Sequence, residues 1–125
     1  TFSLESAIKA RMLSGDISQV SAELLINRSV VEVDGGWQWS SDKRLKSRSP
    51  VRLSELQARD IIESIQAPTL MCLAQDGYDS IQSNYQKFKH CYKHLQKIKV
   101  AGNHHCHMDE VEEIAFAIRQ FITKV

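Results

Sequence analysis

The stretch that most limits how this chain can fold is a short apolar run over residues 69–74, Thr-Leu-Met-Cys-Leu-Ala. Pro68 precedes the run, and the polar residues 75–79, Gln-Asp-Gly-Tyr-Asp, follow it. A run of this length between such boundaries is typical of a strand buried on both faces of a parallel sheet. It predicts an α/β arrangement for this part of the chain.

The residues that follow the run continue this pattern. A helix is predicted to begin at Ser80, residues 97–101 form a second short strand, and a last helix begins after Asp109. The order strand, helix, strand, helix is typical of the end of an α/β domain. The first helix is expected to face the core through Ile81, Tyr85, Phe88, Tyr92 and Leu95, and the last through Val111, Ile114, Ala115, Ile118, Phe121 and Ile122.

The first part of the chain predicts two short helices and a hairpin. Ser3 can cap a helix that ends at Gly15, and a second helix ending near Asn27 is expected to turn Val20 and Leu24 inward. Two alternating runs then surround Asp-Gly-Gly at 34–36, where glycine permits a tight turn. A polar and basic loop leads to Ser54, which forms a capping box with Gln57 ahead of another amphipathic helix.

Composition excludes several classes of protein. The 125 residues suffice for one domain, and a formal net charge of +1 gives no broad field that would attract nucleic acid or anionic lipid. No apolar run has the 18 residues of a membrane span, and no secretion signal is recognisable. Three cysteines without a disulfide spacing favour a reducing, cytoplasmic location. The first residue is threonine rather than methionine, which suggests that a preceding segment has been removed.

A histidine cluster stands out against this ordinary composition. His104, His105 and His107 fall within four residues, between the second predicted strand and the last helix. Because a histidine in a loop can reach solvent and has two nitrogens with separable roles, this position suits general acid and base chemistry. A purely structural role for each histidine, as a cap or as loop packing, is the alternative.

Metal binding is a second alternative, since Cys106 and Asp109 add further ligand types to the cluster. Zinc sites usually combine one local pair of ligands with another pair 12 to 20 residues away. The upstream His90 and Cys91 point about 100° apart on a predicted helix. We therefore expect neither a metal nor another cofactor.

The loops after the two predicted strands should be neighbours. In a parallel sheet both loops open at the same edge, so residues 75–79 and 102–108 are expected to meet. An acid and a histidine would then lie close together. A carboxylate that accepts a hydrogen bond from one imidazole nitrogen leaves the other free to take a proton from a nucleophile.

At this point the sequence resembles the carboxyl-terminal half of an α/β-hydrolase, in particular of the serine-hydrolase-like members. Residues 67–77 look like the penultimate core strand with its acid-bearing loop, and residues 100–109 look like the last strand with the catalytic-histidine loop. Residues 35–45 are similar to the end of a cap domain. The resemblance implies a division into cap-derived helices at 1–66 and a βαβα part of the hydrolase core at 67–125.

The resemblance also implies roles for individual residues. Counting back four from Met108 makes His104 the catalytic histidine. The usual acid position falls on Gly77, which leaves Asp76 one residue early and Asp79 two residues late. Asp76 is the favoured acid, with Asp79 or a residue outside this stretch as the alternatives.

The nucleophile is missing from the sequence. No G-x-S-x-G motif is present, although this is the turn that exposes a serine and supplies part of the oxyanion hole in this superfamily. The first hypothesis is thus a carboxyl-terminal fragment of a serine hydrolase for ester, thioester or related acyl bonds, inactive alone and partnered by the missing amino-terminal half. The second is a non-enzymatic α/β module that dimerises with a second copy through its open sheet edge.

Overall fold

The computed structural model describes residues 1–124, and the chain divides after Pro50 into two compact units. Each unit has its own elements and its own buried cluster, and we describe them separately. The division at 66/67 implied by the hydrolase resemblance concerns the origin of the segments, and it stays a prediction.

The first unit contains two helices followed by a hairpin. Its elements are α1 (Leu4–Gly15), α2 (Gln19–Ser29), β1 (Val30–Val33), β2 (Gly36–Trp39) and a 3₁₀ turn, η1 (Lys43–Lys46). The side chains of Ser3 and Ser18 cap the two helices by accepting hydrogen bonds from backbone N–H groups three residues on. The predicted helices and hairpin are confirmed.

The hairpin gains a third backbone segment from the start of the chain. β1 and β2 pair in antiparallel fashion around Gly35 and Gly36, whose φ angles of 83° and 132° favour glycine. Phe2 exchanges two backbone hydrogen bonds with Trp37, at 3.1 and 3.0 Å. The core cluster of this unit draws on both helices and the hairpin through Ala7, Ile26 and Val30.

The predicted inward face of α2 is wrong. Val20 and Leu24 are 69% and 55% exposed, whereas Ala22 and Ile26 are buried. Both pairs have the i, i+4 spacing of a helix stripe, but the two pairs lie about 200° apart around the axis. Only packing against α1 and the hairpin decides between them.

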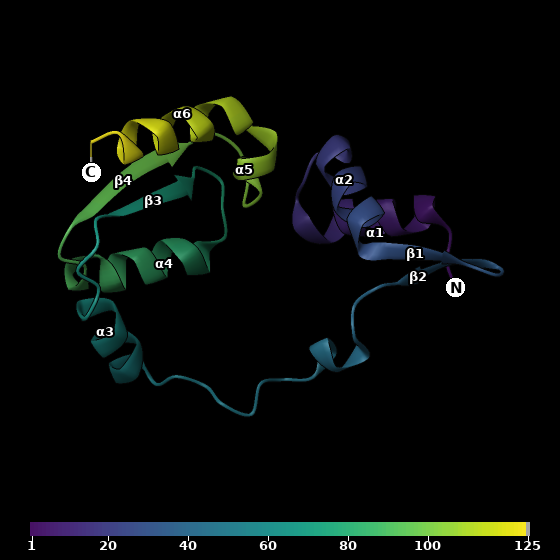
Figure 1. Ribbon diagram of the computed structural model, residues 1–125, viewed down its shortest axis with the longest axis horizontal. Helices are drawn as coiled ribbons and strands as arrows, with labels where there is room; N and C mark the ends of the chain where they lie inside the picture. Colours follow the sequence, from purple (N-terminus) through teal and green to yellow (C-terminus); the bar gives the residue numbers. More distant parts are fainter. Residues whose placement is uncertain (125) are drawn as a thin grey trace. The chain divides into compact units, whose positions relative to one another are not determined.

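The second unit is built on a parallel pair of strands. Its elements are α3 (Glu55–Glu63), β3 (Thr69–Ala74), α4 (Asp79–Phe88), a 3₁₀ turn η2 (Lys89–Cys91), β4 (Leu95–Val100), a short α5 (Cys106–Asp109) and α6 (Val111–Ile122). β3 and β4 pair from Thr69↔Leu95 to Ala74↔Val100. In Figure 1, α4 and α6 lie on opposite sides of this pair. The predicted α/β arrangement with parallel strands is confirmed.

The core of this unit lies at the carboxyl ends of the two strands. Val100 is fully buried and clusters with Ala74, Cys106 and Ile114, which joins both strands to α5 and α6. Burial along β3 is limited to Leu73 and Ala74, whereas the side chains of residues 69–72 are only partly buried. The expectation of a strand buried on both faces along its whole length is therefore wrong for this chain.

The helix after β3 is shorter than its apolar spacing predicts. The spacing continues to Leu95, but α4 ends at Phe88, Tyr92 is extended and Leu95 opens β4. The pairing of Leu95 with Thr69 requires the chain to leave the helix early enough to return to the start of the sheet. Strand pairing here overrides a local helical period.

Val100 offers a test of this core. Val100→Ala removes two buried methyl groups and should lower the free energy of unfolding by about 2–3 kcal/mol. The matched control is Val111→Ala. Val111, Ile118 and Ile122 were expected to face the core but are 55%, 42% and 66% exposed, so that expectation is wrong for them, and the loss of the Val111 side chain should change stability by less than about 0.5 kcal/mol. Urea unfolding followed by circular dichroism measures both. Equal losses in the two variants would contradict the assigned core.

Candidate active site

The loops that follow β3 and β4 are joined by backbone hydrogen bonds. The Gln75 N–H donates to the Val100 carbonyl at 2.8 Å, and the Asp76 N–H donates to the Gly102 carbonyl at 3.0 Å. These two bonds extend the parallel ladder beyond the strands. The expectation that the two loops are neighbours is confirmed.

Each of the two loops contains a glycine at a constrained position. Gly102 has a φ of 83°, in the region that favours glycine. At Gly77 an added Cβ would lie 3.1 Å from the Cβ of Ala74, closer than ordinary side-chain contacts. Gly77 thus stands at the position where the resembled α/β-hydrolases usually carry their acid, and the loop leaves little room for a side chain there.

His104 lies on the surface of the joined loops. It is exposed, and its imidazole stacks on the ring of Tyr78 with centroids 4.3 Å apart and planes 22° apart. His105 meets His104 edge-on at 5.3 Å, and His107 lies 5.9 Å from His105. The three histidines and Tyr78 therefore form a continuous row of rings.

The two candidate acids flank Tyr78 in the sequence, but within residues 1–124 neither is hydrogen-bonded to His104. Asp76 and Asp79 are exposed, and Asp79 is the first residue of α4. Within residues 1–124, no hydrogen bond or ion pair joins His104 to either carboxylate. The structure brings the backbone of Asp76 to the histidine loop, and the roles of His104 and Asp76 stay predictions.

Tyr78 is the residue that sequence reasoning missed. It lies in the loop after β3, between the two candidate acids. An aromatic residue next to a candidate acid in the sequence is a weak signal of a functional role, because that role depends on which residue of the histidine loop its ring contacts.

Cys106 lies between His105 and His107 in the sequence, and its side chain is buried. Burial raises the pKa of its thiol, while hydrogen bonds from the backbone N–H groups of His107 and Cys106 oppose that rise. Burial is also the main cause of the raised pKa of Cys72, and the nearby Cys106 raises that pKa further. A thiol with a raised pKa is a poor nucleophile, so neither cysteine has the environment of a catalytic one.

Cys91 lies apart from the histidine loop, in η2. It is buried, and that burial is the main cause of its raised pKa. The guanidinium of Arg59 lowers the pKa, whereas Glu63 raises it as a nearby carboxylate and hydrogen-bond partner. This thiol too is held in its neutral form.

No metal site is formed in the described part of the chain. Across residues 1–124, no three His, Cys, Asp or Glu side chains come together in a way that could hold an ion. His90 and Cys91, which were not expected to bind a metal, lie on a 3₁₀ turn rather than on the predicted helix.

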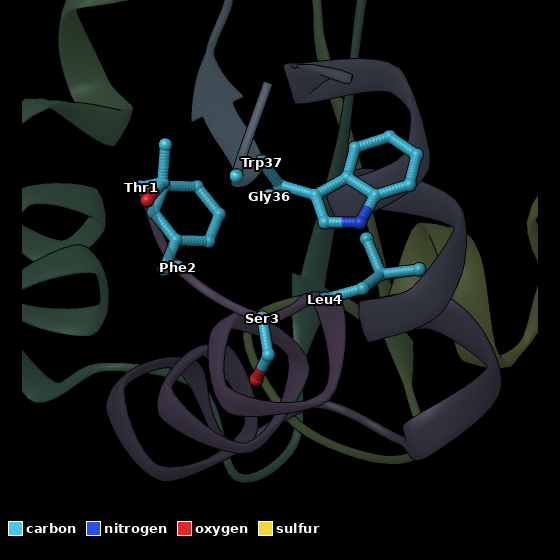
Figure 2. A pocket seen from close by; sticks show the side chains of 7 residues that line it. Thr1, Phe2, Ser3, Leu4, Gly36 and Trp37 are labelled. Atoms are coloured by element: carbon cyan, nitrogen blue, oxygen red, sulfur yellow. The ribbon is translucent and has the colours of Figure 1, made fainter. Parts of the chain in front are cut away.

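A hollow of about 510 Å³ lies in the first unit. Figure 2 shows it between the first residues of the chain and the hairpin, with the Trp37 indole and the Leu4 side chain along the same side. None of its lining side chains is titratable.

Two curated relatives of this chain are named as serine hydrolase-like proteins. A serine hydrolase-like protein of Danio rerio is 26% identical over 117 residues, which cover 85% of this chain and 34% of the relative. Human serine hydrolase-like protein 2 is 28% identical over 97% of this chain and 43% of its own length. No protein-family model matches the chain.

Solved structures share the fold. The hypothetical protein PA1622 of Pseudomonas aeruginosa PAO1 superposes on 95% of this chain and 42% of its own chain, with a TM-score of 0.79 and 32% identity. A thioesterase domain from the curacin biosynthetic pathway superposes on 95% of this chain and 44% of its own, with a TM-score of 0.77 and 21% identity. This chain folds as the carboxyl-terminal portion of an α/β-hydrolase.

The chain spans less than half the length of each of the two curated relatives. It spans 34% and 43% of the lengths of the two curated relatives. None of the helices in residues 1–124 combines the length and apolar character that a bilayer crossing requires.

The buried thiols of this α/β-hydrolase portion predict a pH dependence of stability. Their pKa values are raised in the folded chain, whereas unfolded cysteines titrate near 8.5. The unfolded state therefore loses thiol protons first, so the contribution of the thiols to the free energy of unfolding should be fully present below about pH 8 and should decrease above it. Urea unfolding at pH 7, 8, 9 and 9.5 measures the slope.

The variant Cys106→Ala separates this contribution from other titrations. It removes one of the three thiols, so its stability should fall less steeply above pH 8 than that of the unchanged chain. Identical slopes would show that Cys106 does not contribute to the pH dependence.

Proposed function

We propose that this chain carries the catalytic histidine of a serine hydrolase that cleaves ester, thioester or related acyl bonds. The observation that supports the proposal is the exposed His104 on two joined loops at the carboxyl edge of a parallel strand pair. Ligands and reacting groups bind at this edge in open α/β sheets. The names of the curated relatives favour the same class of reaction.

In the proposed mechanism His104 takes up and releases one proton in each half of the reaction. The imidazole takes the proton of a serine hydroxyl as its oxygen attacks the acyl carbonyl, and then gives it to the leaving oxygen or sulfur as that bond breaks. In the second half the same nitrogen takes a proton from water, whose oxygen attacks the acyl-enzyme, and returns it to the serine. The products are a carboxylic acid and an alcohol or thiol.

Asp76 is the proposed orienting acid, with Asp79 or a residue elsewhere in the protein as alternatives. The backbone of Asp76 is fixed by its hydrogen bond to the Gly102 carbonyl, two residues from His104. The Asp76 side chain is exposed, so packing does not hold its carboxylate away from the imidazole. The Asp76 carboxylate would hold one tautomer and stabilise the imidazolium.

The nucleophile in this proposal lies outside the chain. The sequence has no G-x-S-x-G motif, and the relatives are more than twice as long as the part that matches. Without the serine and the oxyanion donors, both the attack and the main electrostatic stabilisation are missing. We therefore expect the chain by itself to be inactive.

Hydrolysis of p-nitrophenyl acetate tests the role of His104 in a longer protein that contains this chain. His104→Ala should lower kcat by about 10⁴- to 10⁶-fold, since the serine then lacks its base. His94→Ala is the matched control, because this exposed histidine precedes β4 at the opposite end of the strand and should leave the rate unchanged. An active His104→Ala variant would sink the proposal.

The same assay distinguishes the candidate acids. If Asp76 orients His104, Asp76→Asn should lower kcat by about 10⁴-fold and Asp79→Asn should have little effect. The opposite result would assign Asp79. Full activity in both variants would place the acid outside this chain.

A second candidate function is an interaction module that pairs through the free edge of β3. β3 contains no charged residue, whereas β4 carries Lys97 and Lys99. Lysines on a strand are a common protection of a sheet edge, and an uncharged strand with one neighbour leaves its other edge open to pairing. The proposed partner is the other part of the same protein or, in its absence, a second copy of this chain.

Light scattering after size-exclusion chromatography tests this pairing. The chain alone should self-associate with rising concentration, and Leu70→Lys should shift it towards monomer by placing a charge on the open strand. Gln96→Lys is the matched control, because Gln96 pairs with Leu70 but lies on the already protected strand. A chain that is monomeric at all concentrations would contradict self-pairing.

A further inference from the structure

We propose that Tyr78 is a positioning residue for His104, which its ring holds in a fixed orientation at the joined loops. The inference rests on the proposed function, because a fixed imidazole matters only if His104 moves protons. Nothing in the names of the relatives assigns a role to this tyrosine.

The stack limits the motion of an otherwise exposed imidazole. His104 is exposed, so burial does not restrict its two side-chain torsions. Tyr78 covers one face of the imidazole, with the centroids 4.3 Å apart and the planes 22° apart. His105 lies edge-on to the same ring at 5.3 Å. A face contact and an edge contact together define both the tilt and the rotation of the His104 ring.

The backbone of Tyr78 is itself well fixed. Its carbonyl accepts hydrogen bonds from the N–H groups of Ile81 and Gln82 at 2.9 and 3.3 Å, which places it at the start of α4. The side chain of Gln82 in turn donates to the Ala74 carbonyl at 3.1 Å and ties α4 to the end of β3. Tyr78 thus acts from a helix start attached to the sheet rather than from a free loop.

A contact through the ring face suits the chemistry better than a hydrogen bond would. Stacking occupies neither Nδ1 nor Nε2, so one nitrogen remains for an acid and the other for the serine and the leaving group. An aromatic face also attracts the positive charge that the imidazole gains when it takes the proton. Tyr78 is 44% exposed, and so it is not simply part of a buried core.

The first test uses this chain and does not depend on activity. The carbon-bound protons of the His104 ring lie over an aromatic face, and their proton NMR signals should move downfield in Tyr78→Leu, because the ring current is lost. Tyr78→Phe should leave them in place. Tyr85→Leu is the matched control, since Tyr85 contacts Lys89 and Lys97 rather than a histidine. Unchanged His104 signals in Tyr78→Leu would overturn the stack.

The second test uses the longer protein and p-nitrophenyl acetate. Tyr78→Leu should lower kcat by about 10- to 100-fold with KM nearly unchanged, as expected when a catalytic group is misplaced by about 1 Å. Tyr78→Phe should restore the rate, because the ring and not the hydroxyl makes the contact. Tyr78→Gln serves as a second variant if circular dichroism shows that the leucine variant is unfolded.

The outcomes separate this inference from the proposed function. If His104→Ala is fully active, the proposed function fails, and the positioning role fails with it even where NMR finds the stack. If His104 is essential while Tyr78→Leu keeps a normal kcat, only the positioning role is wrong. A rise confined to KM would make Tyr78 a substrate contact, and a phenylalanine variant as slow as the leucine variant would assign the role to the hydroxyl. Either result overturns the inference.

Discussion

The parallel pairing of β3 and β4, continued by two backbone hydrogen bonds beyond the strands, is the constraint on which the rest of the second unit depends. The N–H groups of Gln75 and Asp76 donate to carbonyls of the other strand and its loop, and this brings two loops separated by about 25 residues of chain together. A one-residue change of register would move Tyr78 away from His104. The candidate site is thus a direct consequence of strand register.

Much of this fold could be predicted because its signals are local. The caps at Ser3, Ser18 and Ser54 involve side chains and backbone groups three residues apart, and the apolar run of β3 has recognisable boundaries on both sides. The errors arose where a distant partner decides. The inward face of α2 depends on the hairpin and α1, and the end of α4 depends on the pairing of Leu95 with Thr69.

The candidate site was predictable to a similar extent. Three histidines after a strand are visible in the sequence, and the rule that parallel strands open at one edge correctly places the loop of Asp76 beside them. The stack of Tyr78 on His104 could not be predicted, because it depends on the strand register that brings the two loops together. The acid and the nucleophile raise a different problem, since the relatives contain long segments that this chain does not match.

The buried residue Cys106 determines which way the neighbouring histidines face. Cys106 is buried in the core cluster with Val100 and Ile114, while the histidines before and after it, His105 and His107, remain nearer the surface. Its N–H donates to the Asn103 carbonyl at 2.9 Å, so the loop closes into a tight turn before α5 begins. That turn leaves His104 outside, over the ring of Tyr78. A larger side chain at position 106 would push the turn outward and change the position of His104 without altering any residue of the site itself.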